Sequence, residues 1–233
     1  MLRRSSDNTL YCFSPPVMLA TIIIELGLLI YSLVRYKFTL VTKLVALILF
    51  SLAMFQVAEF QTCGKALGAT GLMWSRVGYI FITLLPPLGL HLISAISKRK
   101  PTLLHWAADA AALILVTIFG LLPSAIYTAL CGGNYVIFKI HEGLGWVYSV
   151  YYLGLLFAGL MLSAKYMKQA KKDQYKALTW MIIGYLLFII PTGFVNLLDP
   201  KTINGVPSIM CGFAVMYAIT LSFVILPRTV KQR

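Results

Sequence analysis

The strongest constraint on the fold of this chain is a series of seven long apolar runs that recur along the whole sequence. A helix rises about 1.5 Å per residue, so a run of about 20 residues crosses the roughly 30 Å hydrocarbon layer of a membrane. Only 12% of the 233 residues are charged, about half the share in a soluble domain. We therefore predict an all-α membrane protein, a single domain over residues 1–233, with seven transmembrane helices at about 16–34, 40–62, 72–96, 103–122, 145–167, 178–198 and 207–226.

The distribution of basic residues predicts how this bundle is oriented. Fourteen of the 20 Lys and Arg residues fall on the side that contains the C-terminus, namely Arg35, Lys37, Lys43, Lys98, Arg99, Lys100, Lys165, Lys168, Lys171, Lys172, Lys176, Arg228, Lys231 and Arg233. Cytoplasmic loops retain positive charge, which predicts an N-terminus outside the cytoplasm and a cytoplasmic C-terminus, in the inner (plasma) membrane of a cell. The net charge of +13 follows from these loops, so no nucleic-acid partner is predicted.

All four cysteines map to the predicted outer end of the bundle: Cys12, Cys63, Cys131 and Cys211. Disulfides persist outside the cytoplasm. We favour a bond from Cys63 to Cys131, which joins two outer loops, and Cys12 with Cys211 is a second candidate pair. The alternative is four unpaired thiols, because free cysteine is also a common small buried residue.

Few ionisable residues fall within the apolar runs, where a charge normally has a partner or a function. Glu25 lies near the middle of the first run, Glu59 near the outer end of the second, and Arg76 one turn inside the third. Equal depth on consecutive helices predicts that Glu59 and Arg76 pair, either to recognise a polar ligand or, as we favour, to fix the helix register. Glu25 is expected to be protonated, since low dielectric disfavours an unpaired carboxylate.

At the predicted inner end, His91 matches His105 and Asp109 in depth, and the last two lie four residues apart on one helical face. This set is a candidate for a pH-sensitive or signal-coupling cluster. The favoured alternative is histidine near the lipid headgroups with Asp109 hydrogen-bonded in the core. No metal site is predicted, because a fourth ligand and a recognised spacing are missing, and no cofactor is predicted.

Aromatic residues concentrate in the outer halves of the third and fifth runs, Trp74 among them, and interfacial belts explain many of them. Tyr148 and Tyr152 share a helical face and lie deeper than a belt requires. They and Tyr79 either belong to the interfacial belt or face a cavity. We expect these three to line a cavity.

Prolines interrupt two of the predicted helices, Pro86 and Pro87 in the third and Pro191 in the sixth. Each removes a backbone hydrogen bond and favours a kink. Such a kink either opens room for a ligand or lets the two halves of a helix move.

The chain resembles the seven-transmembrane sensor region at the N-terminus of bacterial histidine kinases. The similarity is carried by Phe55 to Glu59, by the run Trp74 to Tyr79 that leads to Pro86 and Pro87, by Pro191 followed by Asn196, and by Pro207. The resemblance implies a sensory input module that passes helix motion to an output domain. Only Arg228 to Arg233 follow Pro227, so the output is expected to be a separate cytoplasmic kinase or cyclase, and a homodimer is compatible with this interpretation.

The leading functional hypothesis is thus a non-enzymatic sensor in the lipid bilayer for a small or lipidic ligand. Its expected ligand-binding residues are Arg76, Glu59, Tyr79, Trp74, Tyr148, Tyr152, Glu25 and Asn196, and its expected signal-coupling residues are His91, His105, Asp109, Pro87 and Pro191. The alternatives are a transporter or channel subunit, an intramembrane enzyme and a structural assembly partner. A retinal protein is excluded because residues 207–226 contain no lysine for a Schiff base.

Overall fold

A computed structural model describes residues 15–64, 70–131 and 136–233. Within these ranges, seven helical spans are long and apolar enough to cross a membrane. They are α1 (Pro15–Arg35), α2 (Leu40–Gly64), α3 (Gly71–Ile96), α4 (Leu103–Leu121), α5 (Glu142–Met167), α6 (Lys172–Leu198), and α7 (Val206–Thr220), which continues through the π-helical turn η3 (Leu221–Ile225) into α8 (Leu226–Thr229). The predicted all-α multi-pass membrane bundle is confirmed.

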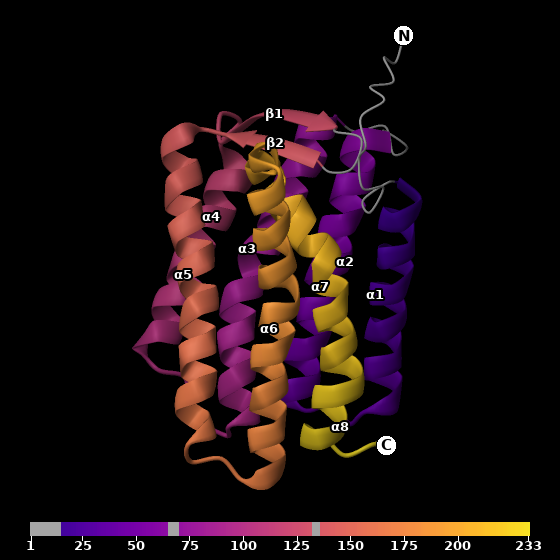
Figure 1. Ribbon diagram of the computed structural model, residues 1–233, viewed down its shortest axis with the longest axis vertical. Coiled ribbons are helices and arrows are strands. Elements are labelled where there is room, and N and C mark those ends of the chain that lie inside the picture. The colour runs from indigo at the N-terminus through magenta and orange to yellow at the C-terminus, as the bar shows by residue number, and fades with distance from the viewer. Residues whose placement is uncertain (1–14, 65–69, 132–135) are drawn as a thin grey trace.

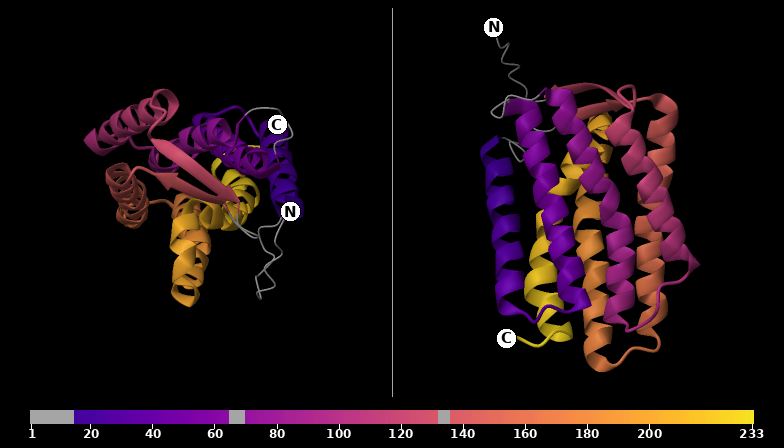
Figure 2. Two further views of the ribbon diagram at one scale, coloured as in Figure 1. Left: turned by 90° about the horizontal axis from the view of Figure 1, so that it is seen from above. Right: turned by 180° about the vertical axis from the view of Figure 1, so that it is seen from behind.

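The helices run side by side, and two short strands lie across one end of the bundle (Figure 1). We call this the hairpin end, and the opposite end, where the chain terminates, the C-terminal end. In the most apolar stretch of α2, α3 and α7, 61% of the residues are buried, against 28–33% in the other four spans. The view from above places α7 among the other helices (Figure 2), so α2, α3 and α7 form the centre of the bundle.

The strands β1 (Ile126–Cys131) and β2 (Val136–Ile140) form an antiparallel hairpin in a segment that we expected to be an outer loop. Side chains alternate along β2, since Val136 and Phe138 are buried and Lys139 is exposed. A disulfide joins Cys63 at the end of α2 to Cys131 at the end of β1, and this is the pairing that the sequence favours. The hairpin is therefore tied covalently to the bundle.

The other two cysteines differ in what the structure says of them. Cys211 is a buried free thiol on α7. Because Cys211 is free, it does not form the alternative disulfide with Cys12. Cys12 itself lies outside the described residues.

Some helices begin earlier than the apolar runs predict. α6 starts at Lys172 rather than near residue 178, and α5 starts at Glu142 rather than Gly145. Hydropathy locates the part of a helix that lies in hydrocarbon, whereas backbone hydrogen bonding continues into polar turns such as Lys172 to Lys176.

Two tyrosines fill notches that glycines open between the helices. A Cβ at Gly89 of α3 would meet the hydroxyl of Tyr185 from α6, and one at Gly159 of α5 would lie 2.9 Å from the same ring. Likewise, a Cβ at Gly184 of α6 would lie 2.5 Å from Cδ2 of Tyr217 on α7. These large rings are accommodated because the facing residues lack side chains.

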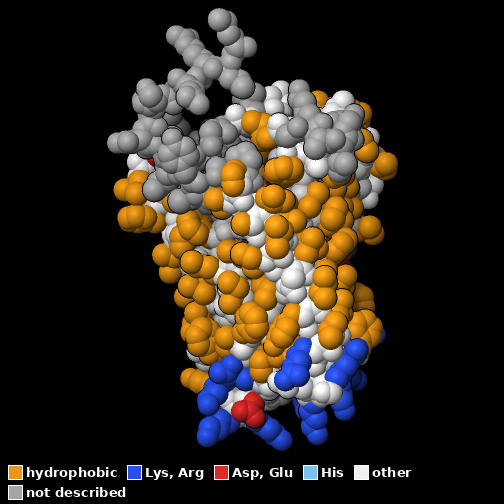
Figure 3. Space-filling model, turned by 90° about the vertical axis from the view of Figure 1, so that its right-hand side faces the viewer, with side chains coloured by type: hydrophobic (Ala, Val, Ile, Leu, Met, Phe, Trp, Pro, Cys, Tyr) orange, Lys and Arg blue, Asp and Glu red, His pale blue; other side chains and the backbone are white. Residues whose placement is uncertain are grey.

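At the C-terminal end, the tail of the chain pairs with the connection between α1 and α2. The amide of Arg233 donates to the carbonyl of Arg35 at 3.0 Å, and the amide of Lys37 donates to the carbonyl of Lys231 at 3.2 Å. Lys and Arg side chains gather at this end of the molecule below a surface that is largely hydrophobic (Figure 3).

Candidate functional site

A cavity of about 560 Å³ lies directly beneath the hairpin. Its walls come from β1 and β2, from the hairpin-end halves of α3 and α5, and from the first turns of α7. Ligand pockets in proteins commonly have volumes of about 300–1,000 Å³. The cavity is therefore large enough for a small organic molecule or part of a lipid.

The deep wall of the cavity contains the three tyrosines that we expected to line one, Tyr79 of α3 and Tyr148 and Tyr152 of α5. All three are buried. The ring centroids of Tyr79 and Tyr148 are 5.3 Å apart, and those of Tyr148 and Tyr152 are 5.9 Å apart. This prediction is confirmed, because residues 148 and 152 share a face of α5 that turns towards α3.

The three tyrosines give the deep wall of the cavity its aromatic character. The hydroxyl of Tyr148 accepts a bond of 3.4 Å from Thr83. The side chains of Tyr79 and Tyr152 are more than nine-tenths buried and line the same wall.

A proline in α3 helps to fix the position of α5 beside this cavity. Pro87 has no backbone N–H, so the carbonyl of Thr83, four residues earlier, lacks its usual helical partner. The hydroxyl of Tyr151 donates to that carbonyl at 2.7 Å. Tyr151 lies three residues after Tyr148, slightly less than one helical turn. The bond from Tyr151 therefore helps to fix the rotation of α5 that turns Tyr148 and Tyr152 inward.

The mouth of the cavity is more polar than its deep wall. Lys139 of β2 and Glu142 in the first turn of α5 both line it, and both are exposed, as is Ser149. Tyr127 of β1 and Leu153 of α5 are each about half exposed and border the same opening. The site thus joins charged groups at its mouth to an aromatic interior, an arrangement that suits an amphiphilic molecule.

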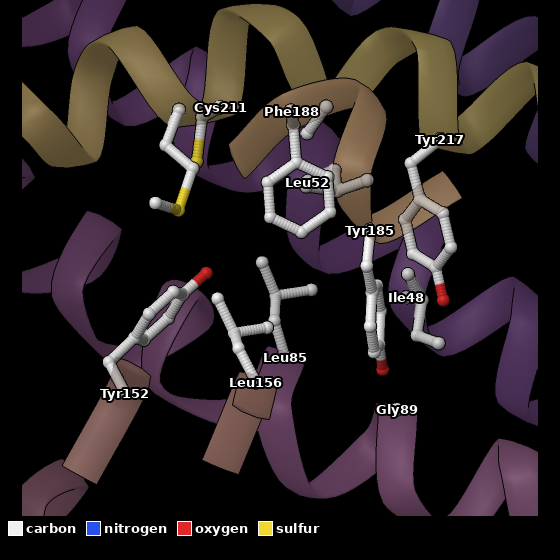
Figure 4. A pocket seen from close by; sticks show the side chains of 12 residues that line it. Ile48, Leu52, Leu85, Gly89, Tyr152, Leu156, Tyr185, Phe188, Cys211 and Tyr217 are labelled. Atoms are coloured by element: carbon white, nitrogen blue, oxygen red, sulfur yellow. The ribbon is translucent and has the colours of Figure 1, made fainter. Parts of the chain in front are cut away.

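A second, much smaller cavity of about 30 Å³ lies deeper in the bundle (Figure 4). Tyr152 and Met210 line both cavities, and the hydroxyl of Tyr152 points into the smaller one, towards Cys211 (Figure 4). A water molecule needs about 10–15 Å³ of such space. The deeper cavity therefore has room for about two waters and does not extend the large one as a wide channel.

The expected ion pair between Glu59 and Arg76 is wrong. A guanidinium nitrogen of Arg76 donates instead to the carbonyl of Pro123 at 3.1 Å, just beyond the end of α4. Oε1 of Glu59 is buried without a partner. Equal depth fixes the height of two residues in the bundle but not the direction in which each faces, and these two face different neighbours.

Five of the expected ligand-binding residues do not line the cavity: Arg76, Trp74, Glu25, Asn196 and Glu59. The side-chain oxygen of Asn196 accepts a 2.6 Å bond from Thr202, so it connects the end of α6 to the short 3₁₀ helix η2 (Pro200–Gly205). The indole N–H of Trp74 is buried without a partner.

The histidine cluster forms at the C-terminal end, far along α3 from the cavity. Nε2 of His91 lies 3.0 Å and 3.2 Å from the two carboxylate oxygens of Asp109. His105 bonds differently, with Nδ1 accepting from the amide of Thr102 at 3.1 Å and Nε2 within 2.8 Å of the hydroxyl of Ser94. Both nitrogens of His105 are thus occupied, and the part of this cluster in signal coupling stays a prediction.

Among the described residues, no group of three or more His, Cys, Asp or Glu side chains is placed to hold a metal ion. Pro87 and Pro191 lie inside α3 and α6, as expected, and their part in signal coupling stays a prediction. No protein-family model and no curated protein sequence matches this chain. Function is therefore inferred from the cavity and its surroundings.

Sequence reasoning missed the hairpin contribution to the cavity, above all Lys139, Glu142 and Tyr127. The strands are only five and six residues long, too short for a hydropathy pattern to separate them from a loop. In the sequence, Val136 to Ile140 is apolar at every position except Lys139, so no alternation of apolar and polar residues marks β2.

Proposed function

We propose that this protein is a non-enzymatic membrane receptor that binds an amphiphilic molecule in the cavity beneath the hairpin. The observation that carries this proposal is the cavity of about 560 Å³, with charged groups at its mouth and three tyrosines in its interior. The resemblance of the sequence to the sensor regions of bacterial histidine kinases supports it.

The lining suggests the chemistry of the ligand. An apolar body would pack against Ile82, Phe138 and Met210, and a hydroxyl or carbonyl at its inner end would lie beside the tyrosines of the deep wall. A polar or charged headgroup would remain beside Lys139 and Glu142 at the mouth. A single-chain lipid or a fatty acid has this division into apolar and polar parts.

The distribution of charge supports an orientation for the receptor. Lys and Arg side chains gather at the C-terminal end (Figure 3), and cytoplasmic loops are rich in such residues. In this orientation the C-terminal end is cytoplasmic, and the cavity opens at the outer face of the inner (plasma) membrane. The ligand would enter from outside the cytoplasm or from the outer leaflet.

The span that begins with α7 is a direct structural route between the two ends. Val206, Pro207 and Met210 line the cavity, and the same span continues to the C-terminal end through the π-helical turn η3. π-helical turns are frequent at functional sites. A ligand that displaces the first turns of α7 would move the C-terminal end, where a separate cytoplasmic kinase or cyclase would read the change.

The smallness of the deeper cavity favours a receptor over a channel or transporter subunit. Beyond Tyr152 and Met210 the free space shrinks to about 30 Å³, which suits a closed binding pocket better than a permeation path.

Two glycines of α5 provide a matched test. A Cβ at either Gly145 or Gly154 would meet nothing within 4 Å, but only Gly145 lines the cavity. Gly145→Phe should therefore fill the cavity, whereas Gly154→Phe should only add a ring to an exposed helix surface. Thermal unfolding of the full chain in phosphatidylcholine nanodiscs is measured with oleate, lysophosphatidylcholine or no addition.

We expect at least one of these amphiphiles to raise the melting temperature of the wild type and of Gly154→Phe, and to leave Gly145→Phe unchanged. No shift with either amphiphile, or an equal shift in all three proteins, would contradict the proposed site.

A further inference from the structure

Two glutamates in the membrane-spanning helices are buried without the partners that such groups need. Glu25 of α1 and Glu59 of α2 have exposed fractions of 0% and 1%. Both carboxylate oxygens of Glu25, and Oε1 of Glu59, have no hydrogen-bond partner. Acidic residues at such depth are rare and normally pair with another group. Such a partner is not recorded for these carboxylate oxygens among the described residues.

The two glutamates belong to one cluster. Glu25 and Glu59 interact electrostatically, and the buried thiol of Cys211 on α7 interacts with both. The hydroxyl of Ser208, one turn before Cys211, hydrogen-bonds Glu59. Gln56 is also buried and lies three residues before Glu59, on the same face of α2. The residues of this cluster belong to α1, α2 and α7, and Glu25, Glu59 and Cys211 among them are buried.

Among the described residues, no positive charge is recorded beside this cluster. Among the residues that the structure describes, the ion pair between His91 and Asp109 is the one recorded, and Arg76, the nearest candidate by depth, is directed to Pro123. The remaining titratable neighbours, Cys211 and Tyr79, carry no positive charge. Within the described part of the chain, the charge of an ionised carboxylate in this cluster is therefore not balanced.

We propose that Glu25 and Glu59 bind one small monovalent cation, such as Na⁺, between α1, α2 and α7. Carboxylate, amide and hydroxyl oxygens are the ligands that hard cations prefer. The charge balances when one of the two carboxyl groups keeps its proton and the other is ionised against the cation. A divalent ion fits less well, since no third acidic, His or Cys ligand joins the two carboxylates among the described residues.

The cation site is connected to the hairpin through a chain of hydrogen bonds. The amide of Val136, the first residue of β2, donates to Oγ of Ser208 at 3.2 Å, which leaves the Ser208 hydroxyl hydrogen for Glu59. The next two residues of β2, Ile137 and Phe138, line the large cavity. Binding of a cation at Glu59 therefore acts on the strand that covers the cavity.

The experiment is thermal unfolding of the full chain in phosphatidylcholine nanodiscs at a fixed, mildly alkaline pH. Na⁺ or K⁺ replaces choline at constant ionic strength. We expect the melting temperature to rise by several degrees and to saturate, because a ligand that binds only the folded state stabilises it. Glu25→Gln and Glu59→Gln should each abolish the response, while Asp173→Asn, which changes an exposed carboxylate at the other end, should retain it.

A melting temperature that does not depend on Na⁺ or K⁺, or an equal response in the wild type and both glutamine variants, would overturn the proposal. If the variants fail to fold, binding of radioactive ²²Na⁺ to the wild type decides. Saturable binding of one ion per chain, displaced by unlabelled Na⁺ but not by choline, supports the site, and its absence overturns it. Neither measurement depends on the amphiphile of the large cavity.

Discussion

The two ends of this bundle treat their polar groups differently. Towards the C-terminal end, His91 is bonded to Asp109 and both nitrogens of His105 are occupied. In the described residues, the buried polar atoms without partners belong to Glu25, Glu59, Trp74, Arg76 and Ser163, and only Ser163 lies towards the C-terminal end. The hairpin half is also where the large cavity lies.

This difference separates the part of the molecule that stabilises the fold from the part that is able to bind ligands. Natural proteins satisfy nearly all their buried polar groups, and exceptions are expected at functional sites. In the C-terminal half, tyrosine rings fill glycine notches without leaving polar atoms free. In the hairpin half, tyrosine side chains line the large cavity instead.

The largest effect should come from the disulfide, which holds the hairpin half together. The bond closes a loop with a sequence separation of 68 residues, for which the chain-entropy relation gives a stabilisation of about 4 kcal/mol. Cys63→Ala should lower the free energy of unfolding by about this amount, measured by thermal unfolding in detergent, whereas Cys211→Ala, which removes the free thiol, should change it much less.

Hydrogen exchange tests whether that loss is confined to one end. In Cys63→Ala we expect faster amide exchange over 126–140 and unchanged exchange at the connection between α3 and α4, since the disulfide contacts only the hairpin end. An equal increase at both ends would contradict the division of the bundle into two halves.

A smaller effect should follow from filling a notch in the packed interior. In Gly184→Ala the new Cβ would lie 2.5 Å and 3.0 Å from two ring carbons of Tyr217, and such overpacking typically costs about 1–3 kcal/mol. Gly193→Ala on the same helix meets nothing within 4 Å and should stabilise α6 slightly, by up to about 1 kcal/mol. Thermal unfolding of the two variants in detergent compares them.

If Gly184→Ala is as stable as Gly193→Ala, Tyr217 moves aside without loss. The packed part of the bundle would then be more adaptable than its close contacts indicate, and the contrast with the hairpin half would be weaker.

Much of this fold could be predicted because membrane spans depend on one strong signal, apolar length. That signal identified all seven helices, and depth along them placed Cys63 near Cys131 and His91 near Asp109. Depth says nothing of the direction in which a side chain faces. The predicted pair of Glu59 with Arg76 failed for this reason, and the same limit hid the contact of Glu59 with Ser208 on α7.

The cavity could be predicted only in part. Tyr148 and Tyr152 were identified because they lie four residues apart on a helix, a local relation that the sequence contains. The wall formed by Lys139, Glu142 and Tyr127 depends on how the hairpin folds over the bundle. Strands this short give no hydropathy pattern from which that fold could be predicted.

The smallest expected effect concerns the ion pair between His91 and Asp109 in the C-terminal half. The question is whether this pair stabilises the folded protein or only gives each polar group a hydrogen-bond partner. His91 and Asp109 have side-chain exposures of 24% and 39%, so the pair lies at the surface of the bundle rather than in its core. Exposed ion pairs in water contribute about 0–1 kcal/mol, but a surface at this depth of the membrane faces lipid, where an unpaired carboxylate is more costly.

A double-mutant cycle measures this interaction directly. We expect His91→Ala and Asp109→Ala each to destabilise the bundle, and the double variant to be less destabilised than the sum of the two, with a coupling energy of about 1 kcal/mol. Strictly additive effects would mean that the interaction between His91 and Asp109 does not contribute to the stability of the bundle. The C-terminal half would then owe its stability to tyrosine and glycine packing alone, and satisfied polar groups would no longer distinguish it from the hairpin half.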